Sequence, residues 1–166
     1  MPAVRSSQRP LGLKAAFEVS DNVLETLRFI EAFDLKGDEE KMRSAKPVGP
    51  RGATLEFKRF LALPLLYPGR QEFPFVPSLP LDALWHTFIL NTPRYRAFCD
   101  RVYGEYLNHV PGKSRRETKR TIKQGSMQFT VDRLETAFEN VNRRYWGGPV
   151  FCGPCSDDAR RVPPSY

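Results

Sequence analysis

The alternation of apolar and polar residues along the chain follows helical rather than strand spacing. Leu24, Leu27 and Ile30 fall on one face of a helix that the pattern predicts to run to about Phe33. Ser20 precedes this segment and is a residue type that caps helix N-termini. No apolar-polar alternation of period two is long enough to predict a β-strand.

The middle of the chain is broken by proline and glycine. Residues 34–53 are polar, with two Pro and three Gly, and predict a long loop with at most a short helical piece. Apolar spacing then starts a helix at Thr54, and Pro64 is expected to end it because proline lacks the backbone donor. Three prolines within residues 71–80 predict an extended connection.

Three further helices are expected in the second half. One covers residues 81–91, and Thr92-Pro93 provides an N-cap and first turn for the next. The last covers residues 131–146. Apolar stripes on these helices predict one buried cluster, formed by Trp85, Phe88, Tyr95, Phe98, Leu134 and Phe138.

These elements predict a mainly α fold, a single helical domain with long proline-rich connections. We place this domain at residues 20–148, between an N-terminal extension (1–19) and a C-terminal tail (149–166). The length of 166 residues, 40% hydrophobic and 27% charged, is typical of one globular domain.

Composition also bears on location. No apolar run approaches the roughly 18 residues that a membrane span needs, and the N-terminal segment lacks a signal-peptide core. Three cysteines argue against a secreted disulfide framework. We therefore expect a cytoplasmic protein that does not contact a membrane.

The net charge of +7 is concentrated in residues 113–123, which hold six basic residues and one Glu. This segment is either a solvated loop or a surface for phosphate or an acidic partner, helped by Arg143 and Arg144. Aromatic residues are not interleaved with it, so base stacking has little support. The basic residues are Lys113, Arg115, Arg116, Lys119, Arg120 and Lys123.

The segment Cys152-Gly-Pro-Cys155 matches the active-site tetrapeptide of thioredoxin-like proteins. Such a site needs a preceding strand and a following helix, whereas only eleven residues follow Cys155 here. Two interpretations remain: half of a tetrahedral zinc site, or a pair of tail thiols without a role.

Residues 76–111 carry a dense pattern: Asp82, Trp85-His86, Phe98-Cys99 and His109. This pattern resembles the glycine-rich domain-containing protein-like family, especially its small bacterial members. The resemblance implies a fold unit rather than an activity. Many members have a second His where this chain has Phe88, so functions that need it are not implied here.

The two histidines of the chain both lie in this segment and suggest a zinc site. Asp82 and His86 are one helical turn apart, so that Asp82 can orient the imidazole. The predicted ligands are His86, His109, Cys152 and Cys155, with Cys99 as a substitute. The alternative is a structural role: a hydrogen-bonded Asp82-His86 pair, a turn at His109 and a small buried thiol at Cys99.

The leading functional hypothesis is a binding or interaction module without enzymatic activity, whose partner is a protein or a nucleic acid. A structural zinc-binding protein and a nucleic-acid-binding protein are the alternatives. Hydrolase motifs such as H-E-x-x-H and G-x-S-x-G and a phosphate-cradling glycine loop are missing from the sequence.

The nucleic-acid hypothesis predicts a salt-dependent mobility shift. Replacing the six basic residues of 113–123 by Gln should abolish binding to DNA or RNA at low salt without changing far-UV circular dichroism. For the wild type, the logarithm of the binding constant for duplex DNA should fall linearly with the logarithm of the salt concentration. The slope should be about −0.9 for each phosphate that the protein contacts. Absence of any shift at low salt would leave the segment as solvated surface.

Overall fold

The computed structural model describes residues 9–45, 52–109 and 118–146. These residues form one mainly helical domain, as the sequence predicted, and contain no β-strand. The elements are η1 (Pro10–Gly12), α1 (Asp21–Ala32), α2 (Lys36–Ala45), α3 (Ala53–Leu66), α4 (Leu79–Leu90), α5 (Thr92–Tyr103), α6 (Thr118–Ala137) and α7 (Arg143–Trp146). Within the described residues, no helix is both long and apolar enough to cross a membrane.

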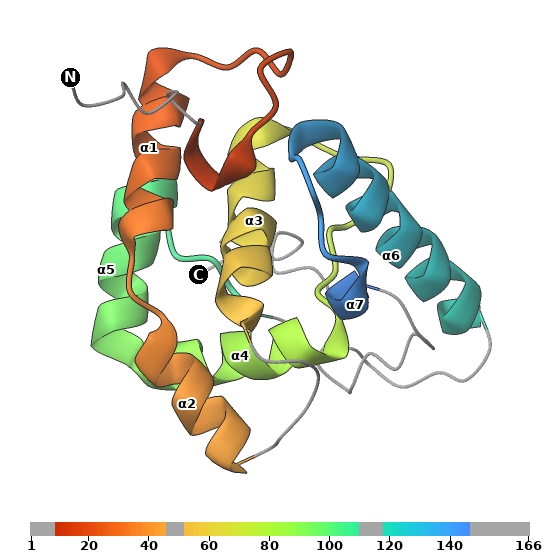
Figure 1. Cartoon of the computed structure of the whole chain (residues 1–166). Helices are drawn as coiled ribbons and strands as arrows, with labels where there is room; N and C mark the ends of the chain where they lie inside the picture. Colours follow the sequence, from red (N-terminus) through yellow and green to blue (C-terminus); the bar gives the residue numbers. More distant parts are fainter. Residues whose placement is uncertain (1–8, 46–51, 110–117, 147–166) are drawn as a thin grey trace.

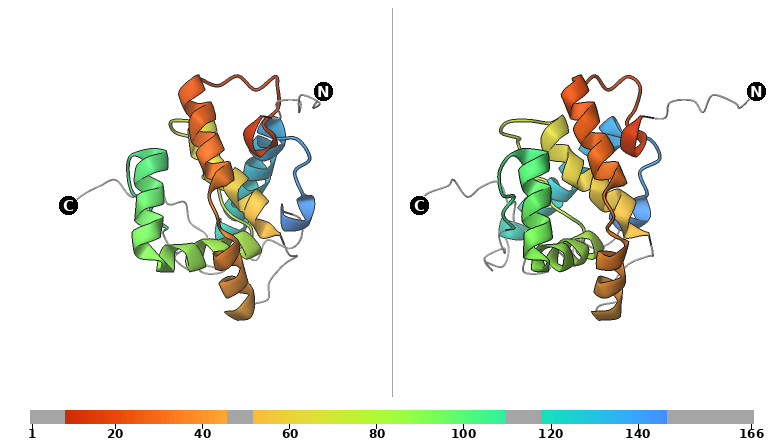
Figure 2. Two further views of the ribbon diagram at one scale, coloured as in Figure 1. Left: turned by 60° about the vertical axis from the view of Figure 1, so that its left-hand side comes forward. Right: turned by 90° about the vertical axis from the view of Figure 1, so that its left-hand side faces the viewer.

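Helix α3 lies at the centre of the domain. It contacts α1 on one side and α6 on the other, and α4 crosses near its end (Figures 1 and 2). Nine of its fourteen residues are buried, which is typical of a helix surrounded by other elements. Helix α5 packs against α4, and α2 packs mainly against α4 as well.

Helix α1 forms as predicted. The Ser20 side chain accepts a hydrogen bond from the Val23 amide at 3.4 Å and so caps its N-terminus. Leu27 and Ile30 are fully buried on the face that the apolar spacing indicated.

For residues 34–53 the sequence predicts a long loop with at most a short helical piece. The structure differs, because α2 is a helix of ten residues within this segment. Its sequence is polar, and tertiary contacts explain why it is helical. Met42 is buried, and Asp38 pairs with Arg94 of α5. The Arg94 guanidinium also lies over the Phe33 ring, 4.8 Å from its centroid, next to the start of α2.

Pro64 does not end α3, contrary to the sequence prediction. The helix continues to Leu66 and closes with a hydrogen bond from the Tyr67 amide to the Leu63 carbonyl at 2.9 Å. Leu63 and Leu66 are both buried. Their packing offsets the single backbone hydrogen bond that a proline near a helix end removes.

The helix predicted at residues 131–146 is also corrected. Helix α6 begins earlier, at Thr118, and ends at Ala137, and α7 is separate. Between them the chain turns at Asn140, with φ of 51°, and pairs with the N-terminal segment. The Lys14 amide donates to the Ala137 carbonyl and the Glu139 amide to the Gly12 carbonyl, each at 2.8 Å.

The predicted helix boundaries around residue 80 shift by one or two positions. Helix α4 begins at Leu79 rather than residue 81, and Asn91 rather than Thr92 occupies the N-cap position of α5. The predicted core cluster is confirmed, because all six residues are buried in one hydrophobic core. Leu11 and Leu13, from the segment predicted as an extension, belong to the same core.

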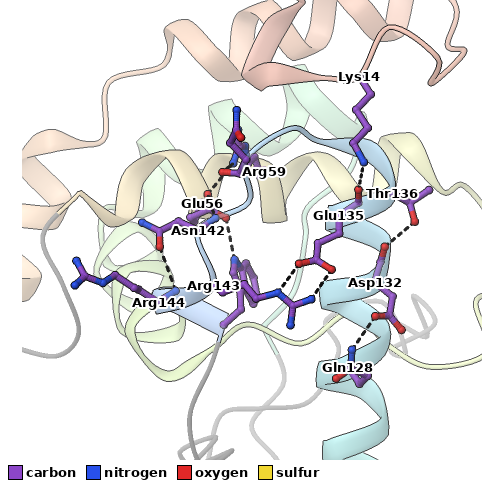
Figure 3. Close-up of polar contacts among 12 residues, drawn as sticks. Lys14, Glu56, Arg59, Gln128, Asp132, Glu135, Thr136, Asn142, Arg143 and Arg144 are labelled. Carbon is purple, nitrogen blue, oxygen red and sulfur yellow. Dashed lines mark hydrogen bonds and ion pairs between the residues drawn. The ribbon is translucent and has the colours of Figure 1, made fainter.

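A buried ion pair on α3 holds the two ends of the described chain together. Arg59 donates to Glu56 at 2.8 Å, to the Leu11 carbonyl at 2.9 Å and to the Glu139 carbonyl at 2.9 Å. Glu56 in turn accepts hydrogen bonds from the Trp146 indole at 2.9 Å and the Asn142 amide at 3.2 Å. Figure 3 shows Glu56 and Arg59 of α3 beside the segment that carries Asn142.

Replacing Arg59 by Met should destabilise the fold by about 3–5 kcal/mol, because the Glu56 carboxylate would stay buried without the positive charge that pairs with it. Urea unfolding followed by Trp fluorescence measures this loss. Arg101→Met is the matched control, because Arg101 pairs with Glu25 at 3.5 Å on the exposed surface, and such pairs contribute about 1 kcal/mol or less. Equal losses in the two variants would contradict the role of Arg59.

Candidate metal centre

Helix α4 supplies two of the candidate site residues. Its N-terminus follows extended residues, with Ser78 at the N-cap and Pro80 in the first turn, where the missing backbone donor costs nothing. The apolar residues Leu81, Leu84, Trp85 and Phe88 face the core. Asp82 and His86 lie one turn apart, and Asp82 Oδ2 is 3.4 Å from His86 Nδ1, as the spacing predicted.

His109 reaches the same carboxylate from the segment after α5. Its Nε2 lies 2.9 Å from Asp82 Oδ1, and its ring centroid lies 4.6 Å from that of His86. The sequence predicted Asp82 only as a partner of His86. The structure shows that one carboxylate contacts both histidines, because the chain returns to α4 after α5.

The three side chains differ in their access to solvent. Those of His109 and Asp82 are 5% and 8% exposed, whereas that of His86 is 40% exposed. The cluster therefore sits at the boundary of the core, with His86 on its solvent side.

Three features of the structure place His109 beside α4: a turn, a hydrogen-bonded tyrosine and an aromatic contact. Gly104 ends α5 in the left-handed conformation, with φ of 72°, and redirects the chain toward α4. The Tyr95 hydroxyl donates to the Leu107 carbonyl at 2.6 Å and accepts from the Trp85 indole at 3.1 Å. The Trp85 ring also packs against the His109 ring, with centroids 4.4 Å apart. The sequence placed Trp85 and Tyr95 in the predicted core and did not predict their part in positioning His109.

Cys99 lies outside this cluster. Among the described residues, the group whose ligand atoms come within 4.8 Å of one another consists of Asp82, His86 and His109. Cys99 is fully buried, and burial raises the pKa of its thiol. Burial likewise raises the pKa of the neighbouring Tyr95 hydroxyl. A neutral, buried thiol of this kind is a poor nucleophile.

Several predicted site residues fall outside the described parts of the chain: Cys152, Cys155, Lys113, Arg115 and Arg116. Lys119, Arg120 and Lys123 belong to the first turns of α6, and the structure describes only their backbone. Arg143 forms two hydrogen bonds with Glu135, at 2.6 and 2.7 Å, so its charge is already paired (Figure 3). Arg144 is exposed. The basic surface remains a prediction.

Replacing Tyr95 by Phe keeps the ring and removes the hydroxyl between Trp85 and Leu107. The fold should lose about 1–3 kcal/mol, because the buried indole N–H and the Leu107 carbonyl both lose their partner. Urea unfolding is the measurement. The matched variant Tyr106→Phe, whose side chain is partly exposed, should change stability by no more than about 0.5 kcal/mol. If Tyr95→Phe lost no more stability than the control Tyr106→Phe, the positioning role of the Tyr95 hydroxyl would be contradicted.

Comparison with known proteins places the chain in a family. No curated protein and no solved structure matches it. The model of the UCP032817-like family matches residues 27–145, more than two thirds of the chain, a range that includes Asp82, His86 and His109. This match overturns the expected membership of the glycine-rich domain-containing protein-like family, which no comparison supports. The chain belongs to the UCP032817-like family.

Proposed function

We propose that this protein is a metal-binding module in which Asp82, His86 and His109 bind one divalent ion, with zinc as the first candidate. The observation that carries the proposal is the convergence of two imidazoles on one buried carboxylate. Imidazole nitrogens and carboxylate oxygens are ordinary zinc ligands, and three protein ligands are the number that catalytic or exchangeable zinc sites use.

The distances are compatible with a shared ion. Two ligands at about 2.0–2.1 Å from a tetrahedral zinc lie about 3.3 Å from each other. The two contacts of Asp82 use different oxygens: Oδ2 lies 3.4 Å from His86 Nδ1, and Oδ1 lies 2.9 Å from His109 Nε2. Both separations are close to this value. One donor atom from each of the three residues lies within 4.8 Å of the other two. Side-chain rotations that bring each pair to about 3.3 Å would place the three donors around one ion.

The local packing supports the same proposal. The Asp82 side chain is 8% exposed, and a buried carboxylate needs a cation or several donors to offset its lost hydration. His109 is fixed by the Trp85 ring and, through Leu107, by Tyr95. Fixing a ligand before the ion arrives lowers the entropy cost of binding.

The sequence-based ligand set combined the two histidines with Cys152 and Cys155. The proposed centre keeps the histidines and adds Asp82 as a direct ligand. The role of the two cysteines is left to experiment, because both lie outside the described residues.

The test is zinc stoichiometry and affinity in wild type and variants. The protein is stripped with a chelator, reloaded and analysed for bound zinc, and the affinity is measured by calorimetry. Wild type should bind one zinc per chain and gain thermal stability on loading. His86→Ala and Asp82→Asn should each weaken binding by at least about tenfold.

Controls separate this site from other ligands. His86→Ala alters a partly exposed residue, and its fold is checked by circular dichroism of the metal-free protein. Asp100→Asn removes an exposed carboxylate of α5 and should leave zinc binding unchanged. No bound zinc in wild type would refute the proposal. Full binding in both site variants, with loss in Cys152→Ser/Cys155→Ser, would move the site to the tail.

A further inference from the structure

The candidate centre is open on one side. Its two deeper ligands, His109 and Asp82, are 5% and 8% exposed, whereas the His86 side chain is 40% exposed. Trp85, itself 3% exposed, covers part of the His109 ring. A solvent molecule or small ligand can therefore approach an ion at this site past His86.

Among the His, Cys, Asp and Glu side chains of the described residues, three come together at this place, and no fourth joins them. Cys99, the one cysteine among the described residues, is fully buried beside Tyr95 and is not part of the cluster. Zinc and cobalt in sites of this kind take at least four ligands. For an ion held by these three side chains alone, the remaining position is filled from solution.

The charge of the ligand set decides what can fill that position. Metal ligands are bound as neutral imidazoles and as an ionised carboxylate. A divalent ion with Asp82, His86 and His109 therefore keeps one net positive charge. A site closed by two additional thiolates would instead carry one net negative charge and would repel anions.

From this geometry, and resting on the metal binding proposed above, we infer that the ion held by Asp82, His86 and His109 exchanges its solvent ligand for a small anion. The class of ligand is a compact monoanion with an oxygen or nitrogen donor, such as a carboxylate or azide. The anion binds directly to the metal on the side of His86.

Cobalt(II) reports this binding, because its visible absorption depends on the number and type of ligands. The metal-free full-length chain is loaded with one equivalent of Co²⁺ and titrated with azide and with acetate, with sodium perchlorate as the ionic-strength control. We expect a saturable change of the visible bands with one anion per cobalt. The Cys152→Ser/Cys155→Ser variant should give the same change, because neither thiol is a ligand in this arrangement.

Three other results of the cobalt experiment would contradict the inference. Stoichiometric cobalt binding without a spectral response to either anion would overturn this inference and leave the proposed metal binding intact. An intense near-ultraviolet thiolate band that disappears in the double Cys variant would also overturn it, because the tail would then fill the open position. Failure of wild type to bind cobalt or zinc would overturn both proposals.

Discussion

The buried ion pair between Glu56 and Arg59 is the interaction on which the arrangement of the domain depends. Both residues belong to the central helix α3, and their partners lie more than forty positions away on either side in sequence, at Leu11 and at residues 139–146. Most of these partners are backbone groups, and the other is an indole N–H. The ion pair therefore fixes the path of the main chain in two irregular segments. Removing water from these charges is costly, and the network of hydrogen bonds offsets that cost.

Helix α3 is also linked to the candidate metal centre, through the aromatic side chains of α3 and α4. Phe60 of α3 packs edge-on against Trp85 of α4, with ring centroids 5.5 Å apart, and Trp85 packs against His109. The core and the centre therefore share one side chain, Trp85. Its ring belongs to the apolar cluster, and its indole N–H orders the Tyr95 hydroxyl that holds Leu107.

The buried polar cluster around Glu56 and the one around Asp82 differ in whether their groups are free to bind a further ligand. Around Glu56 the carboxylate oxygens accept from Arg59, Asn142 and Trp146, so the charge is matched by protein donors. Around Asp82 the partners are two imidazoles, which change from donors to metal ligands by changing tautomer or losing a proton. This difference is the physical reason for giving the Glu56 cluster a structural role and for proposing metal binding at the Asp82 cluster.

The sequence by itself determined the helical class, the core residues of α4 and α5, and the pairing of Asp82 with His86, because these follow from spacing along one helix. It could not determine elements that depend on distant partners. Helix α2 is polar and is stabilised by its packing on α4 and by the Arg94 contact, and α3 continues past Pro64 because Leu66 is buried. The break after Ala137 arises because residues 137–139 pair with residues 12–14. The sequence placed His86 and His109 in one predicted site, but only the tertiary structure brought His109 to Asp82. That contact requires the chain to return to α4 after Gly104 and the hydrogen bond from Tyr95 to Leu107, which depends on residues of another element.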